Sequence, residues 1–244
     1  MIPGTTPSEL LRSALERDGA RPFVTYYDDA TGERIELSVA TFDNWVTKTA
    51  GLLRDGLDVG PGDRVALLLP AHWQSLVLAS ACWAVGACAV LDEAGEAGLA
   101  VVGPATMMAA SGAREILALS LRPMGARFTE GLPAGVLDYA VEVPSYPDRF
   151  VAYDAPDPAE PALDDGGMVT TYGGLVARAT DRAAQLAAGP GARLLVATDD
   201  LRTALLDALL VPLVLRGSAV LVRNEIRERR EGRLATERAR TAGS

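Results

Sequence analysis

The stretch from residue 60 to 92 constrains the fold of this chain most strongly, because its pattern predicts a strand, a helix and a second strand in succession. Residues 60–63, Gly-Pro-Gly-Asp, have the composition of a turn. Residues 64–69 form a short apolar run, typical of a parallel strand that is buried on both faces. Apolar residues then recur at three- and four-residue steps over 71–85, which predicts a helix, and 87–91 form a second apolar run. We therefore predict a βαβ unit with a right-handed crossover, covered by helices.

The same pattern occurs a second time, about 130 residues further on. A glycine-proline turn and apolar run at 189–196, a helical pattern at 201–215 and a second apolar run at 217–221 match the first unit in order. The preceding helices also match, since Thr-Phe begins the segment 41–46 and Thr-Tyr the segment 171–176. The sequence thus indicates an internal repeat, although any two βαβ units share such periodicities in general.

We expect an α/β protein of two similar βαβ-containing subdomains, with mainly parallel sheets flanked by helices. The acidic, proline-rich segment around 154–161 marks the boundary between them. The predicted parts are a first α/β subdomain with an amino-terminal hairpin (1–155), a linker (156–165), a second, smaller α/β subdomain (166–222) and a charged tail (223–244). The tail is dense in Arg and Glu and lacks an apolar face, so we expect a solvated helix or a disordered segment.

Several local elements are also predicted. Thr6-Pro7-Ser8-Glu9 has the pattern of a helix start with a capping box. Residues 23–27 and 33–37 are expected to form a hairpin, and 99–102 and 116–119 are expected to add strands to the first sheet. Trp83 should be buried between the helix of the first unit and its sheet.

Composition excludes several classes of function. A net charge of −9 opposes nucleic acids or anionic membranes as main partners, because both would repel an acidic surface. The first eight residues lack the basic start and apolar core of a signal peptide. The longest apolar stretch, 76–91, is too short to span a membrane and is interrupted by Gly86. We expect a cytoplasmic protein.

Few side chains of the sequence could bind a metal ion or act as a catalytic nucleophile. Cys82 and Cys88 are expected to be reduced core thiols. His72 is the only histidine, so no zinc site of His and Cys can form, and its place after Pro70 predicts a surface position. Lys48 is the only lysine. We therefore predict no catalytic residues and no metal site.

Two segments carry a resemblance to a known family: Gly-Leu-Asp-Val-Gly-Pro-Gly-Asp-Arg-Val-Ala-Leu-Leu-Leu-Pro at 56–70 and Ala-Cys-Trp-Ala-Val-Gly-Ala at 81–87. They resemble the acyl-adenylate-forming (AMP-binding) ligases, which include acyl-CoA synthetases, luciferases and peptide-synthetase adenylation domains. The resemblance covers residue 21 to about 91 well and the second half more loosely. It implies the amino-terminal large domain of these enzymes, with two similar sheets and helices.

The resemblance also locates a remnant of a nucleotide site. In the family a loop rich in Ser, Thr and Gly, ending in Pro-Lys-Gly, holds the ATP phosphates through backbone N–H groups and the lysine. The matching place here is 164–175, where Gly166, Gly167, Thr170 and Thr171 are the candidate nucleotide-binding residues. Gly166 stands where the lysine is expected, and two aspartates precede it.

Other family elements have no counterpart in the sequence, including the adenine-binding motif, the ribose-binding aspartate and the small carboxyl-terminal domain with its catalytic lysine. We therefore expect a truncated, degenerate homologue without ligase activity or cofactor, binding a small acyl or aryl ligand or a protein partner. One alternative is an active AMP-forming acid-thiol ligase that uses ATP and Mg²⁺ with an altered loop. Another is an unrelated doubly wound domain with its ligand near Asp92 and Asp199.

Overall fold

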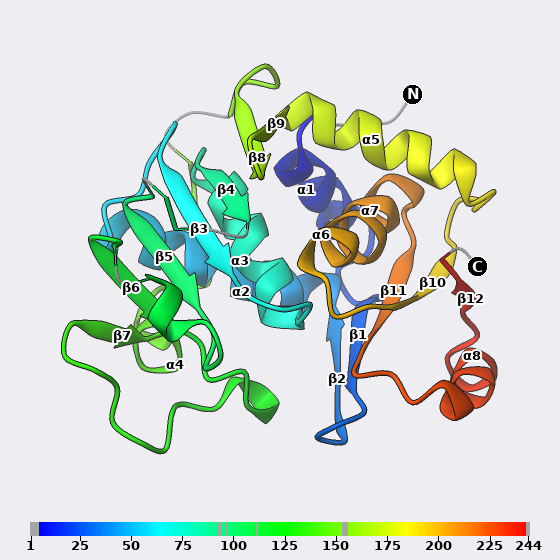
Figure 1. Ribbon diagram of the computed structural model, residues 1–244. Coiled ribbons are helices and arrows are strands. Elements are labelled where there is room, and N and C mark those ends of the chain that lie inside the picture. The colour runs from blue at the N-terminus through cyan, green and yellow to red at the C-terminus, as the bar shows by residue number, and fades with distance from the viewer. Residues whose placement is uncertain (1–4, 92–93, 96, 111, 153–155, 243–244) are drawn as a thin grey trace. The chain divides into compact units, whose positions relative to one another are not determined.

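The computed structural model describes residues 5–91, 94–95, 97–110, 112–152 and 156–242. They form two compact units, each built on a sheet that is mostly parallel and is flanked by helices (Figure 1). Unit 1 comprises Met1–Asp43, Ala71–Leu76 and Gly173–Ser244, and unit 2 comprises Asn44–Pro70 and Val77–Tyr172. The predicted α/β class is confirmed.

Among the described residues, the sheet of unit 2 has seven strands in the order β7-β6-β5-β3-β4-β8-β9. Neighbouring strands run parallel, except that β8 and β9 form an antiparallel hairpin. The strands are β3 (Arg64–Leu68), β4 (Cys88–Leu91), β5 (Leu99–Val102), β6 (Glu115–Ala118), β7 (Val136–Asp138), β8 (Pro161–Asp165) and β9 (Met168–Thr171). The two further strands expected after the first unit are therefore confirmed as β5 and β6.

The described part of unit 1 contains a five-stranded sheet in the order β12-β10-β11-β1-β2. Its strands are β1 (Pro22–Asp28), β2 (Glu33–Ser38), β10 (Arg193–Ala197), β11 (Ser218–Arg223) and β12 (Arg240–Thr241). Strands β1 and β2 form the predicted antiparallel hairpin, and the other pairs are parallel.

The helices include those predicted near 71–85 and 201–215. They are α1 (Pro7–Asp18), α2 (Val39–Gly51), α3 (Trp73–Ala84), α4 (Tyr139–Glu142), α5 (Tyr172–Gln185), α6 (Leu201–Thr203), α7 (Val211–Leu215) and α8 (Arg230–Glu237), with π-helical turns at Leu52–Gly56 and Ala204–Leu210. The capping box at the start of α1 is present, since Thr6 accepts from the Glu9 N–H and the Glu9 carboxylate accepts from the Thr6 N–H.

The internal repeat is visible in the strand registers. Arg64 of β3 lies opposite Cys88 of β4, and Arg193 of β10 lies opposite Ser218 of β11 in the same way. The hairpins match as well, but they are exchanged: β1–β2 of the first repeat pairs with β11 of the second, and β8–β9 of the second pairs with β4 of the first. Each sheet thus combines the βαβ unit of one repeat with the hairpin of the other.

This exchange explains why the units differ from the predicted subdomains. Residues 1–43 join residues 173–244, because the backbone of β1 pairs with that of β11. The expected linker 156–165 ends in strand β8, whose register with β4 places Leu163 opposite Ala89. Pro161 fits this strand because it is the first residue, where a missing N–H is tolerated.

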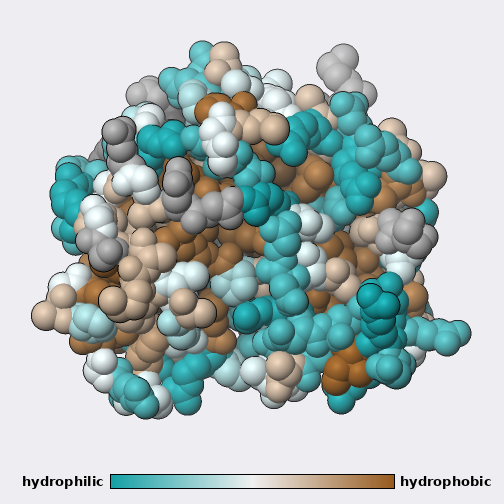
Figure 2. All heavy atoms as spheres, viewed as in Figure 1, coloured by the Kyte–Doolittle hydropathy of each residue, from teal (hydrophilic) through white to brown (hydrophobic). Residues whose placement is uncertain are grey.

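The charged tail is more ordered than predicted. Helix α8 buries Arg233 and Glu237, although its outward surface is mainly hydrophilic (Figure 2). The Arg233 guanidinium donates to Asp29 at 2.6 Å and lies over the Tyr27 ring, while Glu237 accepts from the Tyr27 hydroxyl at 2.5 Å. Of the two forms expected for the tail, the helix is therefore confirmed and the disordered segment is not, and charged side chains, instead of an apolar face, attach the helix to the sheet.

Candidate functional site

The four predicted nucleotide-binding residues lie together on the β8–β9 hairpin of unit 2. Gly166 and Gly167 are the two turn residues, with φ of 59° and 87°. Positive φ at both central positions is the conformation of a tight type I′ hairpin turn, which glycine adopts without strain. Thr170 and Thr171 belong to β9 and are half-buried.

A carboxylate occupies the inner side of this turn. Asp164 Oδ1 accepts the N–H of Gly167 at 2.8 Å, and Asp164 Oδ2 accepts from the guanidinium of Arg64 at 2.7 Å. The hydrogen bond from Arg64 and that from the Gly167 N–H hold the pKa of Asp164 below its ordinary value, against the effect of burial. A fixed negative charge therefore lies beside the turn, and one of the turn's amides is already used.

The base of the hairpin is anchored by two buried aromatic side chains. The Tyr172 hydroxyl donates to the carbonyl of Ala87 at 3.0 Å, and the Trp83 indole N–H donates to the carbonyl of Ala162 at 2.9 Å. Trp83 is only 1% exposed, so its predicted burial is confirmed. These bonds attach the hairpin to the neighbouring part of unit 2 and restrict its rearrangement around a ligand.

His72 was predicted at the surface, and this was wrong, because it is buried in unit 1. Its Nδ1 accepts the N–H of Gln74 at 3.2 Å, which leaves the ring proton on Nε2. That nitrogen lies 3.9 Å from Glu33 Oε2, and the ring packs against Tyr26 with 4.6 Å between ring centroids. Burial lowers the pKa of His72, and the nearby Glu33 carboxylate opposes the shift.

The cluster around His72 continues to the carboxyl ends of two parallel strands. Asp28, at the end of β1, accepts from the Asn224 side-chain amide at 2.9 Å and lies 3.8 Å from the Arg223 guanidinium. Burial raises the pKa of Tyr26, so its hydroxyl stays protonated. The sequence pattern does not indicate this cluster, because its members come from three distant segments and only the single histidine marks it.

The remaining predicted positions show no assembled chemistry. Cys82 and Cys88 are free thiols in the interior, and burial raises the pKa of both. Asp199 follows β10 and accepts the N–H of Asn224, whereas Asp92 lies outside the described residues. In the described ranges, no three His, Cys, Asp or Glu side chains are placed to hold a metal ion. The helices of that part of the chain include none long and apolar enough to cross a membrane.

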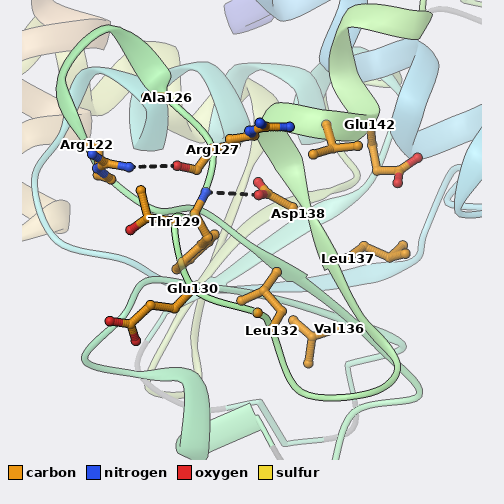
Figure 3. A pocket seen from close by; sticks show the side chains of 13 residues that line it. Arg122, Ala126, Arg127, Thr129, Glu130, Leu132, Val136, Leu137, Asp138 and Glu142 are labelled. Atoms are coloured by element: carbon orange, nitrogen blue, oxygen red, sulfur yellow. Dashed lines mark hydrogen bonds between the residues drawn. The ribbon is translucent and has the colours of Figure 1, made fainter.

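A hollow of about 650 Å³ lies on unit 2 beside β7 (Figure 3). Phe128, Leu132 and Val136 line it and pack against the apolar core of the unit. Arg122 and Arg127 also line the hollow, and the Arg122 guanidinium donates to the Arg127 carbonyl at 3.1 Å. Glu130, Asp138 and Glu142 line the hollow as well, so it combines apolar side chains with both cationic and anionic groups.

Comparison with known proteins defines the class of this fold. The family model "AMP-binding enzyme" matches residues 11–118. The structure of an acyl-CoA synthetase from Brucella canis superposes with a TM-score of 0.76 at 16% identity, covering 94% of this chain and 46% of that one. The chain therefore has the fold of the AMP-binding ligases and spans less than half the length of that synthetase.

A second comparison is closer in sequence. The chain is 39% identical over 248 residues to a "TIGR03089 family protein" of Mycobacterium tuberculosis (strain ATCC 25618 / H37Rv), covering 97% of each. It belongs to this family within the AMP-binding ligase superfamily. The alternative of an unrelated doubly wound domain is thereby excluded.

Proposed function

We propose that this protein is a non-catalytic member of the AMP-binding ligase superfamily, which keeps the fold to bind a small acyl or aryl ligand or a protein partner. The observation that carries the proposal is the two-residue turn at Gly166 and Gly167. A phosphate loop needs several converging N–H groups. This turn has two, and the carboxylate of Asp164 accepts one of them.

The charges of the hairpin support the same conclusion. Asp164 is ionised and fixed near the place where phosphates would lie, and each close like-charge contact would oppose binding by about 1 kcal/mol or more. The only lysine, Lys48, donates to the carbonyl of Tyr146 at 2.7 Å in another part of unit 2. We therefore infer that the protein uses neither ATP nor Mg²⁺.

The hollow beside β7 supports the small-ligand form of the proposal. Its size falls in the usual range for ligand sites, and its floor of Phe128, Leu132 and Val136 suits an acyl or aryl group. The guanidinium of Arg127 provides a positive charge for the carboxylate of such a ligand, although Glu130, Asp138 and Glu142 line the same hollow.

Two measurements test the proposal. Exchange of pyrophosphate into ATP with a panel of carboxylic acids should give no signal, and calorimetry with ATP should show no heat of binding. Robust exchange with any acid would instead establish the alternative, an active ligase with an altered loop.

For the ligand, a thermal-shift screen with aliphatic and aromatic carboxylic acids should raise the melting temperature of the chain. Arg127→Ala should abolish that shift. Arg149→Ala, which changes an exposed arginine outside the hollow, should preserve it. Equal shifts in both variants would contradict the placement of the ligand.

A further inference from the structure

The outer edges of the two sheets are equivalent in the repeat but differ in character. Strand β2 ends the sheet of unit 1, and β9 ends the sheet of unit 2 in the described part of the chain. Both are the second strand of a hairpin, and both hairpins have a register shift after their first residue, at Pro22 and Pro161. The side chains of the β2 edge can therefore be compared directly with those of the β9 edge.

The β2 edge is protected by charge. It carries Glu33, Arg34 and Glu36, and the Arg34 guanidinium lies 3.3 Å from Glu36 and 3.1 Å from Glu237 of α8. Charged side chains and covering elements are the usual means by which proteins prevent an edge strand from pairing with another chain.

The β9 strand lacks such charged side chains. Its sequence, Met-Val-Thr-Thr, contains neither charge nor proline. Met168 is 68% exposed and Val169 is 52% exposed, so two adjacent large apolar side chains of this strand are open to solvent. The whole segment 166–177 is uncharged.

At this edge, backbone N–H and C=O groups point away from the sheet. In a hairpin closed by two residues, the pair that flanks the turn, Asp165 and Met168, exchanges hydrogen bonds. The next pair, Asp164 and Val169, is then the non-hydrogen-bonded kind, so the N–H and C=O of Val169 point away from β8.

We propose that β9 is a self-association edge, at which two copies of this chain pair antiparallel about a two-fold axis through their β9 strands. An antiparallel pair of identical edges is self-complementary, because each Val169 can donate to and accept from its partner strand. The charge distribution of the chain also favours a second copy as the partner at this edge. With a net charge of −9, two chains repel, and the uncharged segment 166–177 provides a place to meet without opposed carboxylates.

The test is the oligomeric state of the full chain, measured by sedimentation velocity over a wide concentration range. The wild-type chain should show a concentration-dependent monomer–dimer equilibrium. Val169→Lys should weaken dimerisation by roughly tenfold or more, because like charges would face each other across the pair. Val169→Pro should do the same by removing the outward N–H, while leaving the β8 ladder intact.

A matched control is Val151→Lys, which places the same charge on a valine that is 68% exposed outside any strand. It should dimerise like the wild type. Hydrogen exchange should show a Val169 amide that is protected only at concentrations where the dimer is populated. A wild-type chain that is monomeric at every soluble concentration would overturn the proposal, as would a dimer that is unchanged by both Val169 variants.

Discussion

The guanidinium of Arg64 reaches across β4 to the carboxylate of Asp164, with 2.7 Å between Nη2 and Oδ2. The second repeat has an equivalent contact, in which Arg193 reaches across β11 and donates to Thr25 Oγ1 at 2.8 Å. In both sheets, an arginine on the first strand of one repeat therefore holds the hairpin contributed by the other. These contacts help to keep the exchanged hairpins in register.

We expect Asp164→Ala to destabilise the chain by about 1 kcal/mol, because the Gly167 N–H and the Arg64 guanidinium lose their acceptor. The effect is limited because the Arg64 side chain is 41% exposed. The pKa of Asp164 is lowered in the folded state, so its contribution is present above the unfolded pKa of about 3.9 and is lost as the pH falls through the folded value.

Urea unfolding at pH 7 and at pH 3 measures this effect. The difference between Asp164→Ala and the wild type should shrink at the lower pH. Asp165→Ala, a change at the next residue of β8, serves as the comparison. A difference that stays constant with pH would show that the loss comes from packing and not from the charge.

Trp83→Ala should cost about 3 to 5 kcal/mol, through lost burial and the cavity left behind. Trp83→Phe should cost less, since the ring is partly replaced and only the indole hydrogen bond to Ala162 is lost. Chemical denaturation with an unchanged m-value would identify the loss as one of native-state stability. A change below about 1 kcal/mol for the alanine variant would contradict the packing role of Trp83.

The sequence was sufficient to predict the local elements and the repeat. Each βαβ unit has a strong period, and the registers of Arg64 with Cys88 and Arg193 with Ser218 follow from matching patterns. The exchange of hairpins could not be predicted, because the period of β1 or β8 shows that a strand forms but not which strand it pairs with. The two compact units therefore each combine segments from both predicted subdomains.

The candidate site, like the fold, could be predicted from the sequence only in part. The turn at Gly166 and Gly167 depends only on neighbouring residues, so the sequence could predict it as a turn. The closure of that turn by Asp164 depends on Arg64, which is 100 residues away. The burial of His72 likewise depends on its packing against Tyr26 and Glu33 of another segment, so no local pattern indicated it.

His72 should make the stability of the chain depend on pH near neutrality. Its pKa is lowered in the folded state by burial, while in the unfolded chain it is about 6.5. Below that pH the unfolded chain binds a proton that the folded chain does not. Stability should therefore fall from about pH 6.5 downward, by up to about 1.4 kcal/mol per pH unit until the folded-state pKa is reached, and should be unaffected by His72 above pH 7.

The groups around His72 set the size of this effect. Glu33 and Asp28 favour the charged imidazole, whereas Arg223 and burial oppose it. Because His72 is the only histidine, unfolding curves between pH 5 and 8 should isolate its titration. His72→Gln should flatten the pH dependence in this window. An equal slope in the variant, or a histidine NMR titration near 6.5 in the folded chain, would contradict the prediction.

Gly166→Lys restores the charge that the resemblance to the AMP-binding ligases leads one to expect, without touching the core. The site has room, since an added Cβ would meet nothing within 4 Å, but the φ of 59° should make the variant less stable by about 1 to 2 kcal/mol. We expect neither the parent nor the variant to bind ATP in calorimetry, because the added lysine cannot supply the missing N–H groups and the Asp164 carboxylate still accepts the N–H of Gly167.

Gly166→Asn is the matched control, because Asn tolerates the same φ and favours this turn. It should keep the parent's stability and should also bind no ATP. A gain of ATP affinity in Gly166→Lys alone would show that the hairpin retains phosphate-binding geometry and lacks only its charge.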